Sequence, residues 1–360
     1  MPYPADYGGA IDVYNKIKAL HQSGIKIHLH CYTKNRQPQP HLLEICRSVN
    51  YYRRNLWAFS FHIPYIVASR NDGMLLENIK ADNFPVLLEG IHCSMLAFKN
   101  QLRGRQVLLR MHNVEYIYYE QLAQNEKNIG KKIFFYWQSR LLKNFERNMA
   151  PRVNNIAISS QDAILYQQKF HVKNMLTIPA FISWQKIEAP AGLGSFCLYH
   201  GNLSISENEN AAIWLIEKVF KETNIPLVIA GKNPGARLKK MIDKNENTCL
   251  VINPSQMDME DLIKKAQVNV LPSFNNTGVK LKLLHALFAG RHCLVNEAAV
   301  AGSGLESLCH VATDVTSFKK LIVDLFKKEF TEEALAERRI LLTTLYNNQK
   351  NAEKISALIP

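Results

Sequence analysis

Residues 268–290 read VNVLPSFNNTGVKLKLLHALFAG. The apolar run Val268–Ser273 predicts a buried strand, and Val279–Ala289 has the apolar periodicity of a helix. Between them, Thr277 and Gly278 stand directly ahead of the predicted helix. A glycine-bearing loop that runs into a helix N-terminus offers free backbone N–H groups and a partial positive charge, which suit a phosphate. The stretch therefore predicts an α/β fold with an anion site at the end of a strand.

Further apolar runs alternate with helical segments on both sides of this stretch. This alternation predicts a parallel sheet with helices on both faces. The other predicted strands of the second half are Phe196–Gly201, Leu227–Gly231, Thr248–Asn253, His292–Asn296 and His310–Thr313. The other predicted helices are Asn208–Lys221, Ala236–Lys244 and Asp258–Ala266.

The first half follows the same plan less regularly. Its predicted helices are Asp12–Gln22, Pro40–Val49 and Lys131–Met149, and its predicted strands are Lys26–Tyr32, Pro85–Gly90, Gln106–Met111, Asn155–Ser159 and Met175–Ile178. The chain opens on PYPADYGG, residues 2–9, a loop of the kind that normally follows the central first strand of a doubly wound sheet. We therefore expect a first domain that lacks its first strand. Either the natural start lies upstream, which we favour, or the domain manages without that strand.

These segments predict two domains. The first covers residues 1–188, and the second covers residues 195–330. Residues 189–194, which are small and turn-rich, are the expected linker. Two further helices, Glu332–Tyr346 and Gln349–Leu358, fall within residues 331–360, and we expect them to pack back on the first domain.

Composition narrows the classes of partner. The 360 residues include 44 basic and 31 acidic side chains, a formal net charge of +13. Such a surface attracts nucleic acid, anionic lipid or phosphorylated small molecules, but the sequence contains no nucleic-acid-binding module. The seven cysteines are scattered and odd in number, which favours reduced thiols in a cytoplasmic protein. We expect no nucleic-acid partner.

Residues 131–143, KKIFFYWQSRLLK, mix aromatic and basic side chains. Such a helix can lie on an anionic membrane, which would place the protein peripherally at the inner membrane face. A core helix with a solvated basic side explains the same pattern, so both interpretations stay open.

Several motifs occur in a fixed order along the chain. After the opening loop at residues 2–9, residues 110–115 read RMHNVE, residues 158–162 ISSQD, residues 199–203 YHGNL, residues 228–231 VIAG, and residues 271–290 contain LPS, TGVKLK and ALFAG. In this order and spacing the sequence resembles the family-4-like retaining glycosyltransferases of GT-B fold, and most closely the bacterial enzymes that build surface polysaccharides. The resemblance implies two Rossmann-like doubly wound domains that face a central cleft.

The resemblance also implies an activity. It implies transfer of a hexose from a nucleotide-sugar donor to a saccharide or lipid-linked saccharide acceptor, with retention of configuration. It implies no metal and no other cofactor.

Donor-binding candidates cluster around the opening stretch. Lys280 and Lys282 bring positive charge to a helix N-terminus, which works against the helix dipole unless an anion is present, although two solvated lysines are the simpler alternative. Lys232 follows a predicted strand and could reach a diphosphate leaving group, or be an ordinary loop lysine. The complete donor-binding set is Gly8, Gly9, Gly201, Lys232, Thr277, Gly278, Lys280, Lys282 and His285.

The candidates on the acceptor side follow strands of the first half. His112 stands at the carboxyl end of the strand Gln106–Met111, where ligands of open α/β sheets bind. The resemblance implies that this histidine contacts the transferred sugar or the acceptor, and we take it as the catalytic candidate. Glu89, His92 and Glu115 are the acceptor-side candidates.

The sequence departs from the family at one place. The family carries two glutamates eight positions apart, whereas this chain has Thr277 and His285 there. A carboxylate can bind both ribose hydroxyls, but a histidine can accept only one such bond. This departure keeps two alternatives open, namely another GT-B enzyme such as a sugar-nucleotide epimerase, and a non-catalytic relative that binds a saccharide or a partner.

Overall fold

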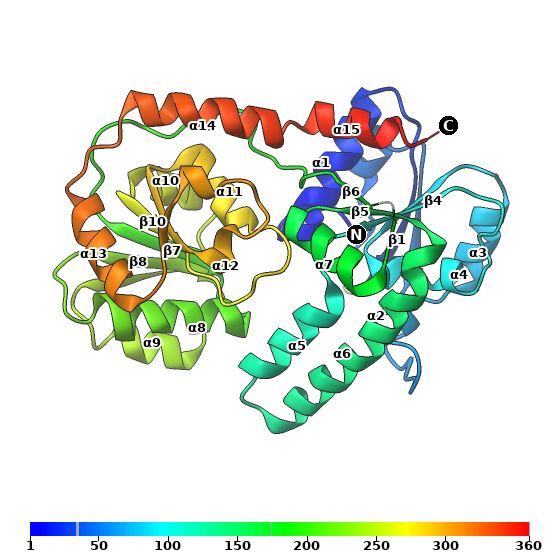
Figure 1. The fold of residues 1–360 in the computed structure, drawn as a ribbon, viewed down its shortest axis with the longest axis horizontal. Helices are drawn as coiled ribbons and strands as arrows, with labels where there is room; N and C mark the ends of the chain where they lie inside the picture. Colours follow the sequence, from blue (N-terminus) through cyan, green and yellow to red (C-terminus); the bar gives the residue numbers. More distant parts are fainter. Residues whose placement is uncertain (34–35, 174, 360) are drawn as a thin grey trace. The chain divides into compact units, whose positions relative to one another are not determined.

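The computed structural model describes residues 1–33, 36–173 and 175–359. The chain divides into two compact units (Figure 1). Unit 1 comprises residues 1–183 and 346–360, and unit 2 comprises residues 184–345. Both units are α/β with parallel strands, as the sequence predicts.

Unit 2 contains a six-stranded parallel sheet in the order β12-β11-β10-β7-β8-β9. Its first strand, β7, lies in the middle, between β8 and β10 (Figure 1). Every strand predicted for this half is present. The bounds are Cys197–Asn202 (β7), Leu227–Lys232 (β8), Thr248–Ile252 (β9), Val268–Val270 (β10), His292–Asn296 (β11) and His310–Ala312 (β12).

The helices predicted for unit 2 are present, whereas the helices Glu297–Val300 and Val315–Phe326 were not predicted. Helix α11 begins at Leu281, two residues later than predicted, because Gly278 takes the left-handed backbone conformation (φ 66°) and Lys280 is the N-cap. The bounds are Ser206–Trp214 (α8, continued by a π-helical turn Leu215–Phe220), Ala236–Ile242 (α9), Gln256–Lys265 (α10), Leu281–Ala289 (α11), Glu297–Val300 (α12), Val315–Phe326 (α13) and Glu332–Leu345 (α14), with a 3-10 turn at Glu306–Leu308.

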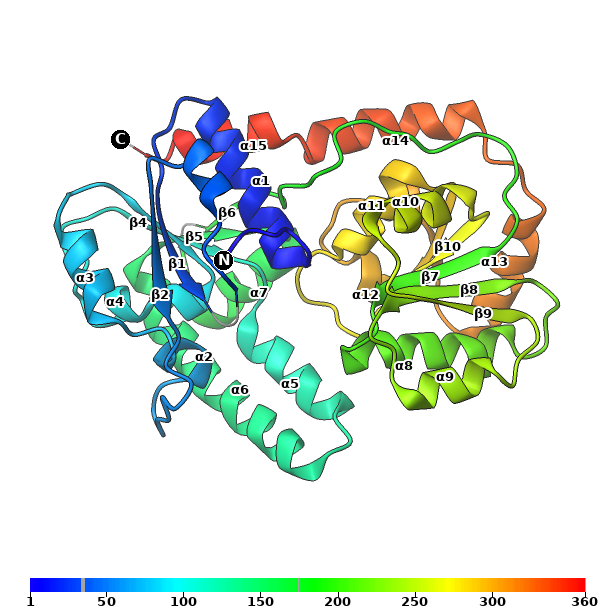
Figure 2. The ribbon, with the colours of Figure 1, turned by 180° about the vertical axis from the view of Figure 1, so that it is seen from behind.

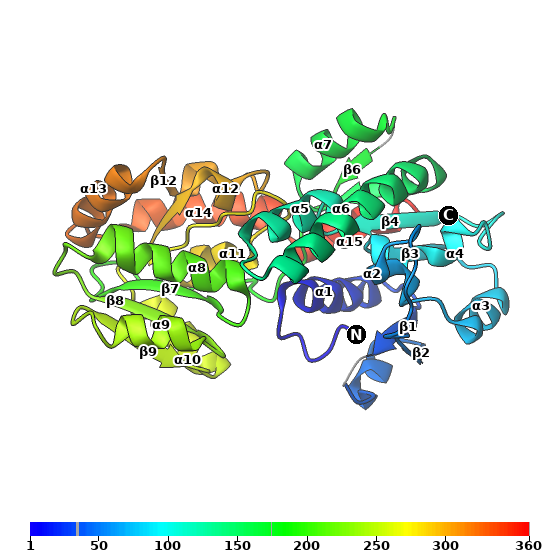
Figure 3. The same ribbon diagram turned by 90° about the horizontal axis from the view of Figure 1, so that it is seen from below.

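Unit 1 divides its strands between two parallel sheets. The larger has the order β3-β4-β5-β6, with bounds Val86–Glu89 (β3), Val107–Met111 (β4), Asn154–Ala157 (β5) and Met175–Thr177 (β6). The smaller pairs β1 (His28–Thr33) with β2 (Ser48–Arg53). Figure 2 shows β1 and β2 running side by side, and Figure 3 shows them on the opposite side of unit 1 from β6.

Helices cover both faces of the larger sheet of unit 1. Leu108 and Ile156 pack with α1 and α15, whereas the neighbouring Leu109 and Ala157 belong to the core on the other face. The bounds are Gly8–Gln22 (α1), Tyr65–Ala68 (α2), Gly73–Lys80 (α3), Met95–Phe98 (α4), Glu115–Asn125 (α5), Ile129–Met149 (α6), Ser160–Phe170 (α7) and Asn348–Ser356 (α15), with 3-10 turns at Pro40–Glu44, Ile91–Cys93 and Ala150–Arg152.

One predicted element of unit 1 is wrong. The helix predicted over Pro40–Val49 is only a 3-10 turn, Pro40–Glu44, and Val49 lies in strand β2. The run of valine and tyrosine in β2 favours a strand, and β1 supplies a parallel partner. Helices α5 and α7 were not predicted.

Candidate functional site

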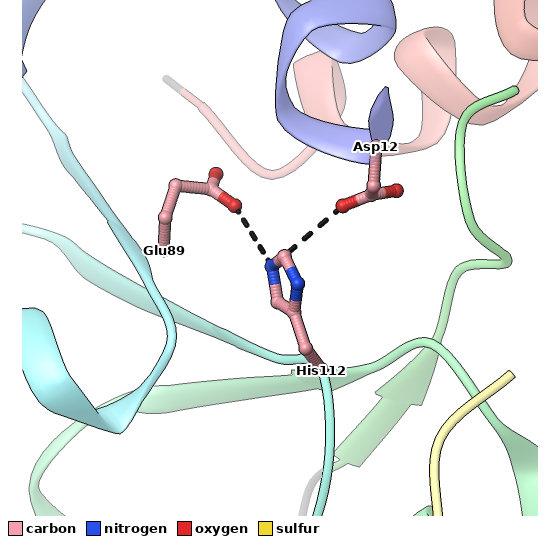
Figure 4. Close-up of side chains that lie close together, drawn as sticks. All are labelled: Asp12, Glu89 and His112. Carbon is pink, nitrogen blue, oxygen red and sulfur yellow. Dashed lines mark hydrogen bonds and ion pairs between the residues drawn. The ribbon is translucent and has the colours of Figure 1, made fainter. Parts of the chain in front are cut away.

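Three side chains of unit 1 converge at the carboxyl ends of β3 and β4 (Figure 4). Glu89 ends β3, His112 follows β4, and Asp12 comes from the second turn of α1. Nε2 of His112 lies 3.3 Å from Oε2 of Glu89 and 3.6 Å from Oδ2 of Asp12. We call these three residues the Asp12–Glu89–His112 cluster.

Two buried cations balance the carboxylates of this cluster. Arg110 pairs with Asp12, and Lys16 pairs with Glu89. The side chains of Arg110 and Asp12 are 0% and 3% exposed, so this pair is shielded from water. Burial alone would raise the pKa of Asp12, but Arg110 and then Lys16 outweigh it and hold that pKa below its ordinary value. Both carboxylates are therefore ionised at neutral pH, because Lys16 and His112 likewise outweigh burial and lower the pKa of Glu89.

The geometry favours one tautomer of His112. Because Nε2 faces two carboxylates, the ring proton is best placed on Nε2, and Nδ1 is left as an acceptor. A Cβ atom at Gly9 would lie 3.7 Å from Nδ1 and 3.3 Å from the Tyr7 ring, so glycine keeps this side of the imidazole open. The first turn of α1, with Gly8 and Gly9, thus lies beside the histidine.

The cluster has the ligand types of a divalent-cation site, but its charges do not suit one. Two carboxylates and an imidazole are ordinary ligands for such ions. Arg110 and Lys16 already neutralise both carboxylates, so a dication would lie beside two buried positive charges. The residues present therefore do not fit a metal unless both ion pairs break.

The other acceptor-side candidates occupy the same end of the sheet. His92 packs its ring under Gly90, where a Cβ would lie 2.7 Å from it, and burial lowers its pKa well below the ordinary value. Glu115 begins α5, and its backbone N–H donates to Glu146 at 3.0 Å. Burial raises the pKa of Glu115 to about 6.

In unit 2, the loop between β10 and α11 is held by its own side chains and by two side chains from neighbouring elements. Oδ1 of Asn275 accepts from the backbone N–H and from Oγ1 of Thr277, both at 2.8 Å. Ser273 donates to Glu207 at 3.1 Å, and Asn296 binds both backbone groups of Ser273. Thr277 is buried, and both its backbone N–H and its hydroxyl already donate to Asn275 within the loop.

The three candidate lysines differ in their surroundings. Lys280 donates to the carbonyl of Thr277 at 2.6 Å and caps α11. Lys282 lies against the Tyr199 ring and contacts Oδ1 of Asn208 at 3.2 Å, and burial lowers its pKa to about 8. Lys232 is exposed at the end of β8, in register with Asn202 of β7.

His285, on α11, lies under an aromatic ring. Trp184 stacks on it with ring centroids 4.3 Å apart, and burial lowers the pKa of His285 to about 4, so the ring is neutral. Its Nε2 atom is buried with no hydrogen-bond partner, as is Nε2 of His200. A ligand hydroxyl that reached this place would find an unused polar atom.

The glycines at the carboxyl ends of β7 and β8 have different roles. A Cβ at Gly231 would lie 2.0 Å from the carbonyl oxygen of Gly201, a distance that no side chain tolerates. A Cβ at Gly201 would make only ordinary contacts with Asn208, at 3.4 Å and beyond. Gly231 is thus required by packing, and Gly201 leaves space at the carboxyl end of the central strand.

Sequence reasoning missed the residues that hold the Asp12–Glu89–His112 cluster. Asp12, Lys16 and Arg110 were not among the candidates, although the charged Arg110 within the apolar run VLLRM is a signal of a buried ion pair. In unit 2 it missed Trp184 and Glu207, for which the sequence gives no local signal.

Comparison with known proteins identifies the fold. Solved structures match nearly the whole chain. Anabaena HepE in complex with UDP and glucose has a TM-score of 0.64 and 10% identity, over 96% of this chain and 94% of that chain. A UDP-forming α,α-trehalose-phosphate synthase of Burkholderia vietnamiensis has a TM-score of 0.59 and 12% identity, over 99% of this chain and 95% of that chain. The fold is GT-B. The GT-B protein TarM of S. aureus, in complex with fondaparinux, alpha-GlcNAc-glycerol and UDP, is also similar (TM-score 0.58, 15% identity, 76% of this chain), and the chain spans 55% of its length.

The sequence comparisons agree with the GT-B fold. Residues 195–328 match the family model of glycosyl transferases group 1. A Klebsiella pneumoniae protein described as an uncharacterized 44.6 kDa protein in cps region is 26% identical over 354 residues, which cover 91% of this chain and 89% of that protein. The predicted resemblance to GT-B glycosyltransferases is confirmed by the fold and by the family of unit 2.

Within residues 1–33, 36–173 and 175–359, no helix combines enough length and enough apolar character to cross a membrane.

Proposed function

We propose that this GT-B chain transfers a hexose from a nucleotide-sugar donor to a saccharide or lipid-linked saccharide acceptor, with retention of configuration and without a metal. The observation that carries the proposal is the pre-formed loop Ser273–Lys280 at the carboxyl ends of β7 and β10, within the part of the chain that matches glycosyl transferases group 1. HepE and TarM, which share the fold, were solved with UDP. The relative from a cps region is consistent with a role in polysaccharide synthesis.

The proposed donor site uses cations and backbone groups. When the bond from the anomeric carbon to the diphosphate breaks, negative charge develops on the leaving group. Lys280, Lys232 and the first turn of α11 would stabilise that charge. Lys282 would join them by exchanging its contacts with Asn208 and Tyr199 for a phosphate oxygen.

The proposed role of unit 1 is to hold the sugar or the acceptor. His112, fixed by Glu89 and Asp12, presents Nδ1 beside Gly9, where it can accept a hydrogen bond from a sugar hydroxyl. Glu115 and His92 would line the acceptor region. The new bond forms between the acceptor oxygen and the anomeric carbon as the bond to the diphosphate breaks, and the proton of the acceptor hydroxyl passes to the departing diphosphate.

A turnover assay tests this function. We expect release of a nucleoside diphosphate from one member of a panel of nucleotide sugars, stimulated by a saccharide or lipid-linked acceptor. Lys280→Ala should lose this turnover, whereas Lys240→Ala, an exposed lysine of α9, should keep it. Equal turnover in both variants would contradict the assignment of the donor site.

A non-catalytic binding protein is the second candidate. Thr277 and His285 stand where the family carries carboxylates. The observation that favours this candidate is that Thr277 is buried, while His285 is half-buried and stacks against Trp184. Nucleotide binding without release of nucleotide from any donor, with or without acceptor, would support this candidate. An epimerase would instead convert the donor without any acceptor.

We also propose that unit 1 contacts an anionic membrane. The carboxyl half of α6 is a core helix that buries Leu142 and Met149, whereas its amino half exposes Ile129 (75%) and Ile133 (64%). Beside this half, Phe59 stacks on Trp137, and Phe61, Phe134 and the 94% exposed Trp57 extend the surface. We call these seven residues the aromatic surface, and the exposed Lys131 and Lys132 stand next to it. A mixed apolar and basic surface of this kind suits a lipid interface.

Vesicle flotation tests the membrane contact. We expect the protein to float with vesicles that contain anionic lipid at low salt, and Trp57→Ala combined with Phe61→Ala to abolish flotation. Ile340→Ala, which removes an exposed apolar side chain of unit 2, is the matched control. Equal recovery with and without anionic lipid would end this proposal.

A further inference from the structure

A cavity of about 260 Å³ lies between the two sheets of unit 1. Residues of β1 line one side and residues of β3 line the other, with side chains of α1 and α3 above and below. Leu20 and Leu87, from the core under α1, and Leu75 and Leu88, from the core on the other face, all line it. The cavity therefore lies in the plane of the sheet and opens onto both apolar cores.

The edge of β1 that borders the cavity carries backbone groups that do not pair with β2. Toward β2, the carbonyls of Ile27 and Thr33 accept from Arg47 and Arg54. Because successive residues of a strand turn their backbone groups to opposite edges, His28, His30 and Tyr32 face away from β2, toward the cavity.

The edge of β3 has the same character. Val86 and Gly90 donate their N–H groups to carbonyls of Gln106 and Arg110, on the β4 side. By the same alternation, Leu87 and Glu89 turn their N–H and C=O groups toward the cavity. Among the strands that the structure describes, none pairs with either edge.

Unit 2 shows what occupies the equivalent place. There β7 precedes α8, α8 leads to β8, and β7 lies between β8 and β10. In unit 1, α1 leads to β1, and the place between β1 and β3 is the cavity. The position that β7 fills in unit 2 is thus open in unit 1, with helices already covering both faces.

We propose that this cavity binds one extended polypeptide strand, parallel to β1 and β3 and apolar on both faces. Its backbone would bond to both free edges, as in peptide recognition by strand addition. Its side chains would fill the two cores, which is the usual setting of a central parallel strand. An acyl chain could fill the same volume but would leave the backbone groups of both edges unpaired, at a cost for each buried group.

The strand would also support the Asp12–Glu89–His112 cluster. Lys16 and Glu89 line the cavity as well as forming the ion pair beside His112. A strand bonded to the backbone of Glu89 would fix the carboxylate that orients the histidine. Strand binding is therefore expected to order this end of unit 1.

A fusion tests the proposal at high local concentration. The sequence of residues 226–232, PLVIAGK, is apolar on both faces and contains β8, which is paired on both edges in unit 2. A copy of it is joined ahead of residue 1 through a flexible linker. The control fusion has proline at the second and fourth apolar positions of the copy, which removes the N–H groups that pair with an edge. Hydrogen exchange is then measured residue by residue.

The expected result is selective protection. Amides of His30, Tyr32, Leu87 and Glu89 should exchange roughly tenfold or more slowly in the strand fusion than in the proline fusion, because they gain bonded partners. The β2-facing amides of Leu29 and Cys31 should change little. Equal exchange in the two fusions would overturn the proposal. The proposal would also be overturned if decanoate or a second copy of the chain buried the cavity side chains without slowing the exchange of these amides.

A pair of variants checks that backbone bonding is responsible. In the strand fusion, His30→Pro removes a cavity-facing N–H while sparing the pairing with β2, and His30→Ala removes only the side chain and its bond to Tyr52. We expect His30→Pro to lose the protection of Tyr32 and Leu87, and His30→Ala to keep it. Equal protection in both variants would contradict main-chain pairing in the cavity.

Discussion

The two units share one plan and differ at its centre. Unit 2 builds a six-stranded sheet around β7, whereas unit 1 has two separate sheets with a cavity between β1 and β3. In unit 2, the close approach of Gly201 and Gly231 joins neighbouring strand ends, and loop side chains complete the site. In unit 1, buried ion pairs perform that task, with Arg110 and Lys16 holding the carboxylates beside His112. The difference teaches that a complete sheet positions the residues at its strand ends with few charged side chains. A site beside an open sheet depends on ion pairs for the same purpose.

The largest effect should come from breaking an ion pair in unit 1. Arg110→Met removes the main counter-ion of the buried Asp12 carboxylate, and we expect a loss of about 3–5 kcal/mol in the free energy of unfolding. Arg237→Met in unit 2, whose pair with Glu217 is exposed and 3.9 Å long, should cost less than about 1 kcal/mol. Urea unfolding, with hydrogen exchange to locate the change, measures both. Similar losses in the two variants would show that unit 1 does not rely on its ion pairs.

The next effect concerns His112. Replacing it with alanine should reduce glycosyl transfer roughly a hundredfold or more, the usual range for a positioned acid–base or hydrogen-bonding group. Steady-state kinetics measure this, with His171→Ala, an exposed residue at the end of α7, as control. Donor affinity, which we assign to unit 2, should be nearly unchanged, so a large loss of donor affinity instead would contradict the division of roles.

The third effect is a pH-dependent change in stability that arises in unit 1. The pKa of Glu115 is raised from 4.5 to about 6, chiefly by burial, so the folded state holds the proton more tightly than the unfolded state. Stability is then lost as pH rises from 4.5 to 6, by about 1–2 kcal/mol. Relative to the wild type, Glu115→Gln should gain that stability above pH 6 and show no gain at pH 4. A difference between the two proteins that does not vary with pH would refute the burial of this carboxyl.

The smallest expected effect is the uptake of protons when a nucleotide binds to unit 2. Burial lowers the pKa of Lys282 to about 8, so part of this side chain is neutral at pH 8.5. A diphosphate beside it would raise that pKa, and binding should take up a fraction of one proton. Calorimetry in two buffers of different ionisation enthalpy measures the uptake, with Lys282→Met as control. Nucleotide binding with no proton uptake at pH 8.5 would place the phosphates away from Lys282.

The sequence predicts more of unit 2 than of unit 1 for physical reasons. Strands buried on both faces, such as β8 and β11, are continuous apolar runs that are easy to find. Strand β2 shows only a partly buried pattern and was not predicted, and the helix predicted over Pro40–Val49 overlaps its first two residues. Glu89 and His112 follow strands and were found by position, but their partners Asp12 and Lys16 lie on another element, so only the folded chain brings them together. The stacking of Trp184 on His285 is likewise a long-range contact with no local signal.

Calorimetric titration with nucleoside diphosphates tests the central claim, that the loop of unit 2 binds a nucleotide-sugar donor. The account predicts that the wild-type chain binds at least one of UDP, GDP, ADP, CDP and dTDP. It predicts that Lys280→Ala loses this affinity and that Arg110→Met, if folded, keeps it. Absence of binding to every nucleotide, or equal affinity in the wild type and in Lys280→Ala, would contradict the claim.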